Sequence, residues 1–103
     1  METIMENESI IPILDEMGVE YSYNGVLIDV TSDTETIKKI MSELENMDYI
    51  CDTDNPLAGL FAQQFATAGL KLGKENPVRL LVFQLALNED ADRGYITFEK
   101  IED

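Results

Sequence analysis

Histidine and tryptophan are absent from this chain of 103 residues, and cysteine occurs once, as Cys51. Histidine is the usual general base near neutral pH and the commonest zinc ligand. Without it, serine–histidine and cysteine–histidine nucleophile systems cannot be built within one chain. A single cysteine allows neither an internal disulfide nor a thiolate cluster for zinc. We therefore expect a protein that is not an enzyme and that binds no cofactor or structural metal.

Positive charge is also scarce. Seven Lys and Arg stand against twenty-one Asp and Glu, which gives a formal net charge of −14 at pH 7. Such an excess repels nucleic-acid phosphates and anionic lipid headgroups. We expect no direct contact with nucleic acid or with a membrane.

Long hydrophobic runs are missing too. The longest uncharged run, residues 55–70, contains Pro56, Gln63 and Gln64, whereas a bilayer span needs about 20 apolar residues. We interpret this run as a core helix. The first residues are acidic where a secretory signal peptide needs a basic region, and one cysteine suits a reducing compartment. These features predict a cytoplasmic protein.

No repeat, low-complexity tract or Pro/Gly/Ser linker divides the sequence, so residues 1–103 are expected to form one domain. A first helix is predicted from Ser9 to Met17, because apolar residues recur at helical spacing and Gly18 supplies a C-terminal stop. A start near Thr3 is the alternative.

Residues 19–30 predict a β-hairpin, because alternating side chains flank Asn24-Gly25, a dipeptide suited to a two-residue type I′ turn. The predicted facing pairs are Tyr23 with Val26, Tyr21 with Ile28, Val19 with Val30, and Glu20 with Asp29. The last pair sets two carboxylates against each other, which solvent, a cation or a partner's basic side chain would have to relieve.

Residues 32–47 predict a second helix, with Ser32 and Glu35 as a capping box and an apolar stripe that ends at Met47. A short strand over residues 48–52 follows. Asn55-Pro56 has the cap-then-proline order that opens a helix. The third predicted helix carries large residues on one ridge and small ones on another. The large residues are Leu57, Phe61, Phe65 and Leu72, and the small ones are Ala58, Ala62, Ala66 and Gly69.

Residues 78–87 are apolar on both alternating faces, which favours a central strand over a short buried helix of nearly the same pattern. Alternation over residues 95–101 predicts a second hairpin across residues 88–94. The predicted order is αββαβαββ. This predicts an α+β fold: a mixed sheet of about five strands, with parallel crossovers, and three helices covering one or both faces.

The carboxylates lie mainly in stretches of the sequence that contain no Lys or Arg. We interpret them as a phosphate-like array that occupies a basic groove on a nuclease or other nucleic-acid-binding protein, where attraction speeds association. In overall charge, though in no motif, the chain is similar to phage-encoded inhibitors of restriction and CRISPR enzymes. The candidate partner-binding residues are Glu6, Glu8, Asp15, Glu16, Glu20, Asp29, Asp52, Asp54, Glu89, Asp90 and Asp92.

Two other interpretations stand beside this one. Acidity alone also keeps small proteins soluble. A structural or regulatory subunit is the alternative function, acting by homo-oligomerisation or on a protein partner through the small-residue helix or an exposed strand edge. A homodimer is compatible with the sequence, and it would need an apolar or locally basic contact surface.

Three further features of the sequence give weaker indications of function. Residues 89–100 partly resemble the calcium loop of EF-hand proteins, but Ala91, Arg93 and Lys100 stand where that loop has oxygen ligands. We interpret the segment as a hairpin loop in which Gly94 permits positive φ. Cys51 falls in a predicted strand, which favours packing over reactivity. Three of the four tyrosines, Tyr21, Tyr23 and Tyr95, suit either a core or an interface.

Overall fold

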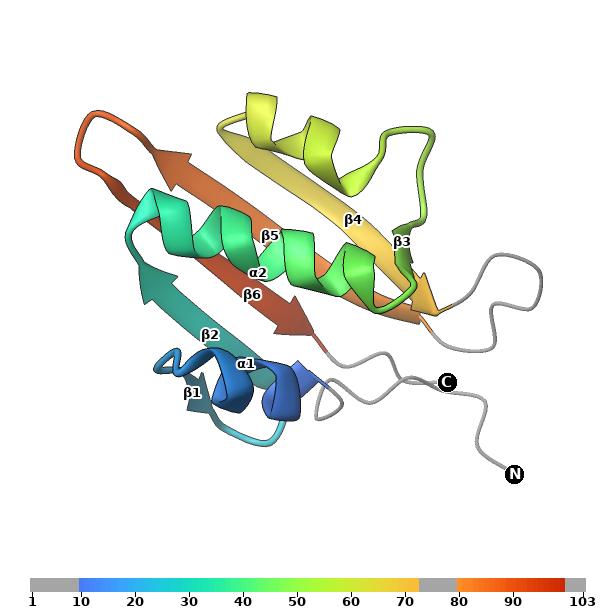
Figure 1. The fold of residues 1–103 in the computed structure, drawn as a ribbon, viewed down its shortest axis with the longest axis horizontal. Coiled ribbons are helices and arrows are strands. Elements are labelled where there is room, and N and C mark those ends of the chain that lie inside the picture. Colours follow the sequence, from blue (N-terminus) through green and yellow to red (C-terminus); the bar gives the residue numbers. More distant parts are fainter. Residues whose placement is uncertain (1–9, 73–79, 100–103) are drawn as a thin grey trace.

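In the computed structural model, which describes residues 10–72 and 80–99, six strands form one sheet in the order β1-β2-β6-β5-β4-β3 (Figure 1). Every pairing between neighbouring strands is antiparallel. The strands are β1 (Ser22–Tyr23), β2 (Leu27–Ser32), β3 (Tyr49–Cys51), β4 (Phe65–Leu72), β5 (Leu80–Asn88) and β6 (Arg93–Glu99).

The described helices all lie on one side of this sheet, as Figure 1 shows: α1 (Ile11–Met17), α2 (Thr34–Asn46) and the 3-10 helix η2 (Leu57–Ala62). Helix α2 packs on β2, β6 and β3 and against η2. The core fills the space between these helices and the inward sheet face. Its largest fully buried side chains include Phe83, Phe98, Ile28, Ile40 and Leu44.

Helix α1 confirms the first predicted helix. It ends at Gly18, which adopts the left-handed conformation (φ 72°) that favours glycine at a helix C-terminus. Ile13 and Leu14 point into the core. Ser9, the predicted cap, lies outside the described residues, as does the alternative start near Thr3.

Helix α2 confirms the second predicted helix, but its start differs. Ser32 is the last residue of β2, and Asp33 is the N-cap. The predicted capping box is therefore wrong, because pairing of β2 with β6 holds Ser32 in the sheet opposite Gly94. Met47 is 39% exposed, so the buried stripe stops at Leu44.

The first hairpin exists in another register. Asn24 pairs with Leu27, so Gly25 (φ 94°) and Val26 form the turn instead of Asn24 and Gly25. The Asn24 side chain explains the difference, because its Oδ1 accepts hydrogen bonds from the Val26 and Leu27 N–H groups. Tyr23 consequently faces Ile28, and Ser22 faces Asp29. The predicted facing pairs, including Glu20 with Asp29, are wrong.

The third predicted helix is also wrong over much of its length. Only residues 57–62 are helical, as a 3-10 helix, and Phe65–Leu72 forms strand β4 between β3 and β5. Within β4, Ala68 and Leu70 point into the core at alternate positions. The predicted ridge of small residues is therefore divided between two elements, and no helix presents it.

The C-terminal half otherwise follows the sequence analysis. Strand β5 confirms the strand over residues 78–87, and β6 pairs with it as the predicted hairpin. The predicted α+β class with three helices is confirmed. The sheet has six strands and is antiparallel rather than mixed. The antiparallel order follows from β4, which takes the place of a crossover helix between β3 and β5; β2 and β3 run in one direction but have three strands between them.

Candidate protein-binding surfaces

No helix of the described ranges 10–72 and 80–99 covers the second side of the sheet (Figure 1). Side chains alternate along each strand, so the residues that do not enter the core point to this side. We call it the uncovered face. Its strand residues are Ser22, Leu27, Asp29, Thr31, Ile50, Phe65, Thr67, Gly69, Lys71, Val82, Gln84, Ala86, Asn88, Arg93, Tyr95, Thr97 and Glu99.

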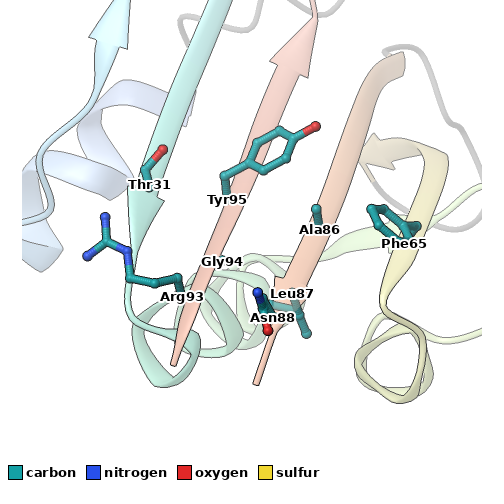
Figure 2. A pocket seen from close by; sticks show the side chains of 8 residues that line it. All are labelled: Thr31, Phe65, Ala86, Leu87, Asn88, Arg93, Gly94 and Tyr95. Atoms are coloured by element: carbon teal, nitrogen blue, oxygen red, sulfur yellow. The ribbon is translucent and has the colours of Figure 1, made fainter. Parts of the chain in front are cut away.

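A hollow of about 290 Å³ opens on the uncovered face between two aromatic side chains, as Figure 2 shows. Ala86 lies opposite Phe65 on one side and Tyr95 on the other. Its methyl group is much smaller than either neighbour, which leaves the space between the rings open. Phe65 is 73% exposed and Tyr95 is 39% exposed. A largely exposed phenylalanine beside an apolar hollow is typical of an interaction surface.

Arg93 and Thr31 stand at the side of this hollow (Figure 2). Arg93 begins β6 and faces Asn88 in the register. Its guanidinium forms no ion pair with any residue of the two described ranges. It is therefore a cation that a carboxylate from outside could bind in a bidentate manner.

Asp29 lies on the uncovered face within the sheet. Its Oδ1 accepts a hydrogen bond of 2.8 Å from the Thr97 hydroxyl, and Thr97 is only 9% exposed. Glu20 is not directly opposite Asp29, but the two residues line one shallow hollow with Ser22 and Thr31. This hydrogen bond holds the Asp29 carboxylate beside Thr97.

Asp52 follows β3 and turns toward the uncovered face. Its carboxylate lies 3.1 Å from the Lys71 ammonium. Its backbone N–H donates to the Gly69 carbonyl. A Cβ at Gly69 would come within 3.1 Å of the Asp52 Cβ, so the glycine makes room for this approach. Lys71 thus partly neutralises a residue predicted to bind a partner.

The other predicted carboxylates lie at separate places. Asp15 and Glu16 are exposed on α1, Asp54 is exposed after β3, and Glu89, Asp90 and Asp92 are exposed in the turn between β5 and β6. Glu6 and Glu8 lie outside the described residues. The described acids of the predicted array therefore do not gather into one cluster.

Asp15 has a specific neighbour. Partial burial of the ring raises the pKa of Tyr21, and the nearby Asp15 carboxylate raises it further by its charge and as the acceptor of a hydrogen bond from the phenol. Tyr21 and Tyr23 pack against the core, whereas Tyr95 lies on the uncovered face. One of the three tyrosines is therefore available to an interface.

The turn between β5 and β6 is closed by local hydrogen bonds. The Asn88 Oδ1 and carbonyl both accept from the Ala91 N–H, and Glu89 lies 3.6 Å from the Lys38 ammonium. The left-handed residue is Asp92 (φ 51°), so the expectation that Gly94 supplies positive φ is wrong. Within the described ranges, no group of three or more His, Cys, Asp and Glu residues could hold a metal ion.

Cys51 is half-buried in β3 and packs against the core, with its Sγ 3.3 Å from the Thr53 hydroxyl. This position agrees with the packing role predicted for it. Phe65 falls within the predicted third helix, so its exposed position on a sheet face differs from the prediction. The alternation of Ala66, Ala68 and Leu70 was the signal that could have revealed a strand.

Charge is divided unevenly between the uncovered face and the rest of the described molecule. The uncovered face, with Glu20 at its edge and Asp52 beside β4, carries four carboxylates and two cations, a net charge of −2 within the described part of the chain. The remaining described residues carry eleven carboxylates against Lys38 and Lys39, a net charge of −9. These acids are Asp15, Glu16, Asp33, Glu35, Glu43, Glu45, Asp48, Asp54, Glu89, Asp90 and Asp92.

Comparisons of this chain with protein-family models, with curated proteins and with solved structures gave no match. Across residues 10–72 and 80–99, no helix has the length and apolar character required to cross a membrane.

Proposed function

We propose that this protein is a non-enzymatic, cytoplasmic binding protein whose carboxylates occupy a basic groove on a nucleic-acid-handling protein. It would act as an inhibitor that mimics nucleic acid, of the anti-CRISPR or anti-restriction type carried by phages and mobile elements. The observation that supports this proposal is the net charge of −9 that the described residues carry away from the uncovered face.

The exposure of these acids makes them available to a partner. Asp15 and Glu16 on α1, and Asp90 and Asp92 in the turn between β5 and β6, are exposed. Among the described acids outside the uncovered face, Glu89 has an ion-pair partner, Lys38. Exposed charges of one sign attract a basic surface over about 8 Å at physiological salt and raise the association rate.

The alternative function is that of an acidic structural or regulatory subunit. Such a subunit would have to bind through a surface other than the two predicted from the sequence, a small-residue helix and an exposed strand edge. The small-residue helix does not exist as predicted, and the sheet edges are short strands, β1 with two residues and β3 with three. Short edge strands offer few backbone groups for pairing. The apolar hollow between Phe65 and Tyr95 is the observation that favours a subunit role.

The test is capture of partners from host lysate with the tagged full chain at low salt, followed by elution in rising salt and mass spectrometry. The proposal predicts capture of a nuclease, polymerase or similar protein that added DNA or RNA displaces. Measured with the purified partner, affinity should fall steeply as salt rises, because the attraction is screened.

Matched variants then show which carboxylates bind. Asp90→Asn and Glu16→Gln each remove one charge from the acidic part of the surface and should slow association several-fold. Glu99→Gln removes the same charge from the uncovered face and is the control, for which we expect an unchanged association rate. Binding that persists in high salt, or that Glu99→Gln alone weakens, would contradict the proposal.

A further inference from the structure

We infer that the uncovered face binds the same face of a second copy of this chain, so that two sheets pack face to face around a two-fold axis. This inference concerns a different surface from the proposed function and does not depend on it. Three observations carry it: the exposed aromatic hollow, the low net charge of the face, and the placement of two opposite charges along β6.

The hollow gives the face an apolar centre. Phe65, 73% exposed, and Tyr95, 39% exposed, flank Ala86 in adjacent strands. Val82 lies on the same face, two register positions beyond Gln84. Burial of aromatic side chains is the main source of binding energy at protein interfaces. Packed sheets bury this kind of alternating face at a separation of about 10 Å.

The distribution of charge favours a second copy over a basic protein as the occupant of the uncovered face. The net charge of −9 is spread over the rest of the described molecule, so a basic protein meets more unpaired carboxylates there than on the uncovered face, with its net charge of −2. Two copies of a chain with a net charge of −14 repel each other least where cations offset part of the negative charge. On the uncovered face, Lys71 and Arg93 offset two of the four carboxylates.

The charges on β6 are complementary under two-fold symmetry. Arg93 and Glu99 stand at opposite ends of the strand, both exposed and both on the uncovered face, roughly 20 Å apart at the usual rise of a strand. A two-fold axis that lies in the plane between the two sheets, perpendicular to β6 and level with the midpoint between the two residues, brings Arg93 of each subunit opposite Glu99 of the other. The dimer thereby gives Arg93 the ion pair that the described residues do not supply.

The experiment is sedimentation equilibrium of the full chain over a wide concentration range. The unmodified protein should form a dimer. Arg93→Glu and Glu99→Arg should each weaken it at least about ten-fold, because each puts like charges together at two symmetric positions. The double variant Arg93→Glu/Glu99→Arg should regain the dimer. Lys39→Glu, on an exposed site of α2, makes the same charge change as Arg93→Glu and should leave dimerisation near the unmodified level.

A second variant tests the apolar centre. Phe65→Ser removes a mostly exposed ring, so the fold should persist, which far-ultraviolet circular dichroism checks, while the dimer dissociates. A protein that is monomeric at every concentration overturns the inference. So does a dimer that none of the uncovered-face variants weakens. Either result leaves the proposed function intact, since partner capture is measured separately and concerns other residues.

Discussion

Gly94 occupies a point where β6, β5 and α2 come close together. A Cβ built there would lie 2.8 Å from the Leu87 Cδ2, 3.0 Å from the Ala86 carbonyl oxygen and 3.4 Å from the Ile37 Cγ1. The carbonyl belongs to the sheet backbone and cannot withdraw without disturbing the β5–β6 pairing. Glycine is required here for its small size, whereas at Gly25 it is required for its positive φ.

We expect Gly94→Ala to lower the free energy of unfolding by about 1–3 kcal/mol, because it overpacks a filled site. Urea denaturation measures the change. Gly59→Ala is the control: its Cβ would meet the Pro56 Cδ at 3.6 Å, an ordinary contact. A Gly94→Ala protein as stable as the Gly59→Ala protein would contradict this account of the packing.

Asp33 is held in its charged form before α2. A hydrogen bond of 2.6 Å from the Thr36 hydroxyl is the largest cause that lowers the pKa of Asp33 below its ordinary 3.8, and a second hydrogen bond from Ser32 adds to it. Because the pKa is lower in the folded state, the stability it contributes is present above about pH 4 and is lost as pH falls through the folded pKa.

Thr36→Val should therefore raise the Asp33 pKa toward its ordinary value. Carboxyl-carbon NMR titration measures that pKa directly. Thr36→Ser retains the hydroxyl and should leave it low. A pKa that stays low in the Thr36→Val protein would show that another group stabilises the carboxylate.

At the scale of elements, the C-terminal end of α2 carries two features that lower the stability of the fold. Asp48 follows the helix in the left-handed conformation (φ 72°), where glycine is usual. Its carboxylate also lies at the negative end of the helix dipole. Both features cost stability, and both can be removed by substitution.

Asp48→Gly is expected to raise the free energy of unfolding by about 1 kcal/mol. Asp48→Ala removes the same charge but keeps a Cβ at positive φ, so it should gain much less. Chemical denaturation of the two proteins separates the backbone effect from the charge effect. Equal stabilities would indicate that the backbone conformation contributes nothing.

The elements also show how far sequence could predict this fold. Helix α2 was predictable because its apolar stripe repeats at helical spacing, β5 because it is apolar on both faces, and β6 because its side chains alternate. Strand β4 was not predicted, because Phe65 fits the large-residue ridge of a helix, and Ala66 and Gly69 its small-residue ridge, as well as they fit a strand. Pairing with β3 and β5 decides its conformation, and those contacts are distant in the chain.

The candidate surfaces were less predictable still. The charge of −14 is visible in the sequence, but how much of it falls on the uncovered face depends on which strand residues point away from α2. The hairpin register depends on one side chain, Asn24, whose Oδ1 competes for the turn hydrogen bonds. A shift of the turn by one residue separates Glu20 from Asp29.

For the whole molecule, self-repulsion is the dominant electrostatic effect. A net charge of −14 on one small domain opposes both folding and self-association, and added salt screens it. We expect sodium chloride to raise the melting temperature and to strengthen the dimer. Affinity for a basic partner should fall over the same range.

Calorimetry and sedimentation in a salt series measure the first two responses. Sodium and magnesium chlorides compared at equal ionic strength provide the control, since a specific cation site would make the magnesium response larger. A melting temperature independent of salt would mean that the repulsion has already been relieved within the fold.

The place of β2 in the sheet bears on how the chain assembles. Leu27 pairs with Glu99, so the first long strand meets a partner near the far end of the described sequence. The strands β4, β5 and β6 pair with neighbours that are close in the chain, whereas β2 pairs with β6 only after all the residues between them have been made. On a ribosome, β2 and α2 would therefore lack their neighbour β6 until residues 93–99 have been synthesised, and chaperones could bind them during that time.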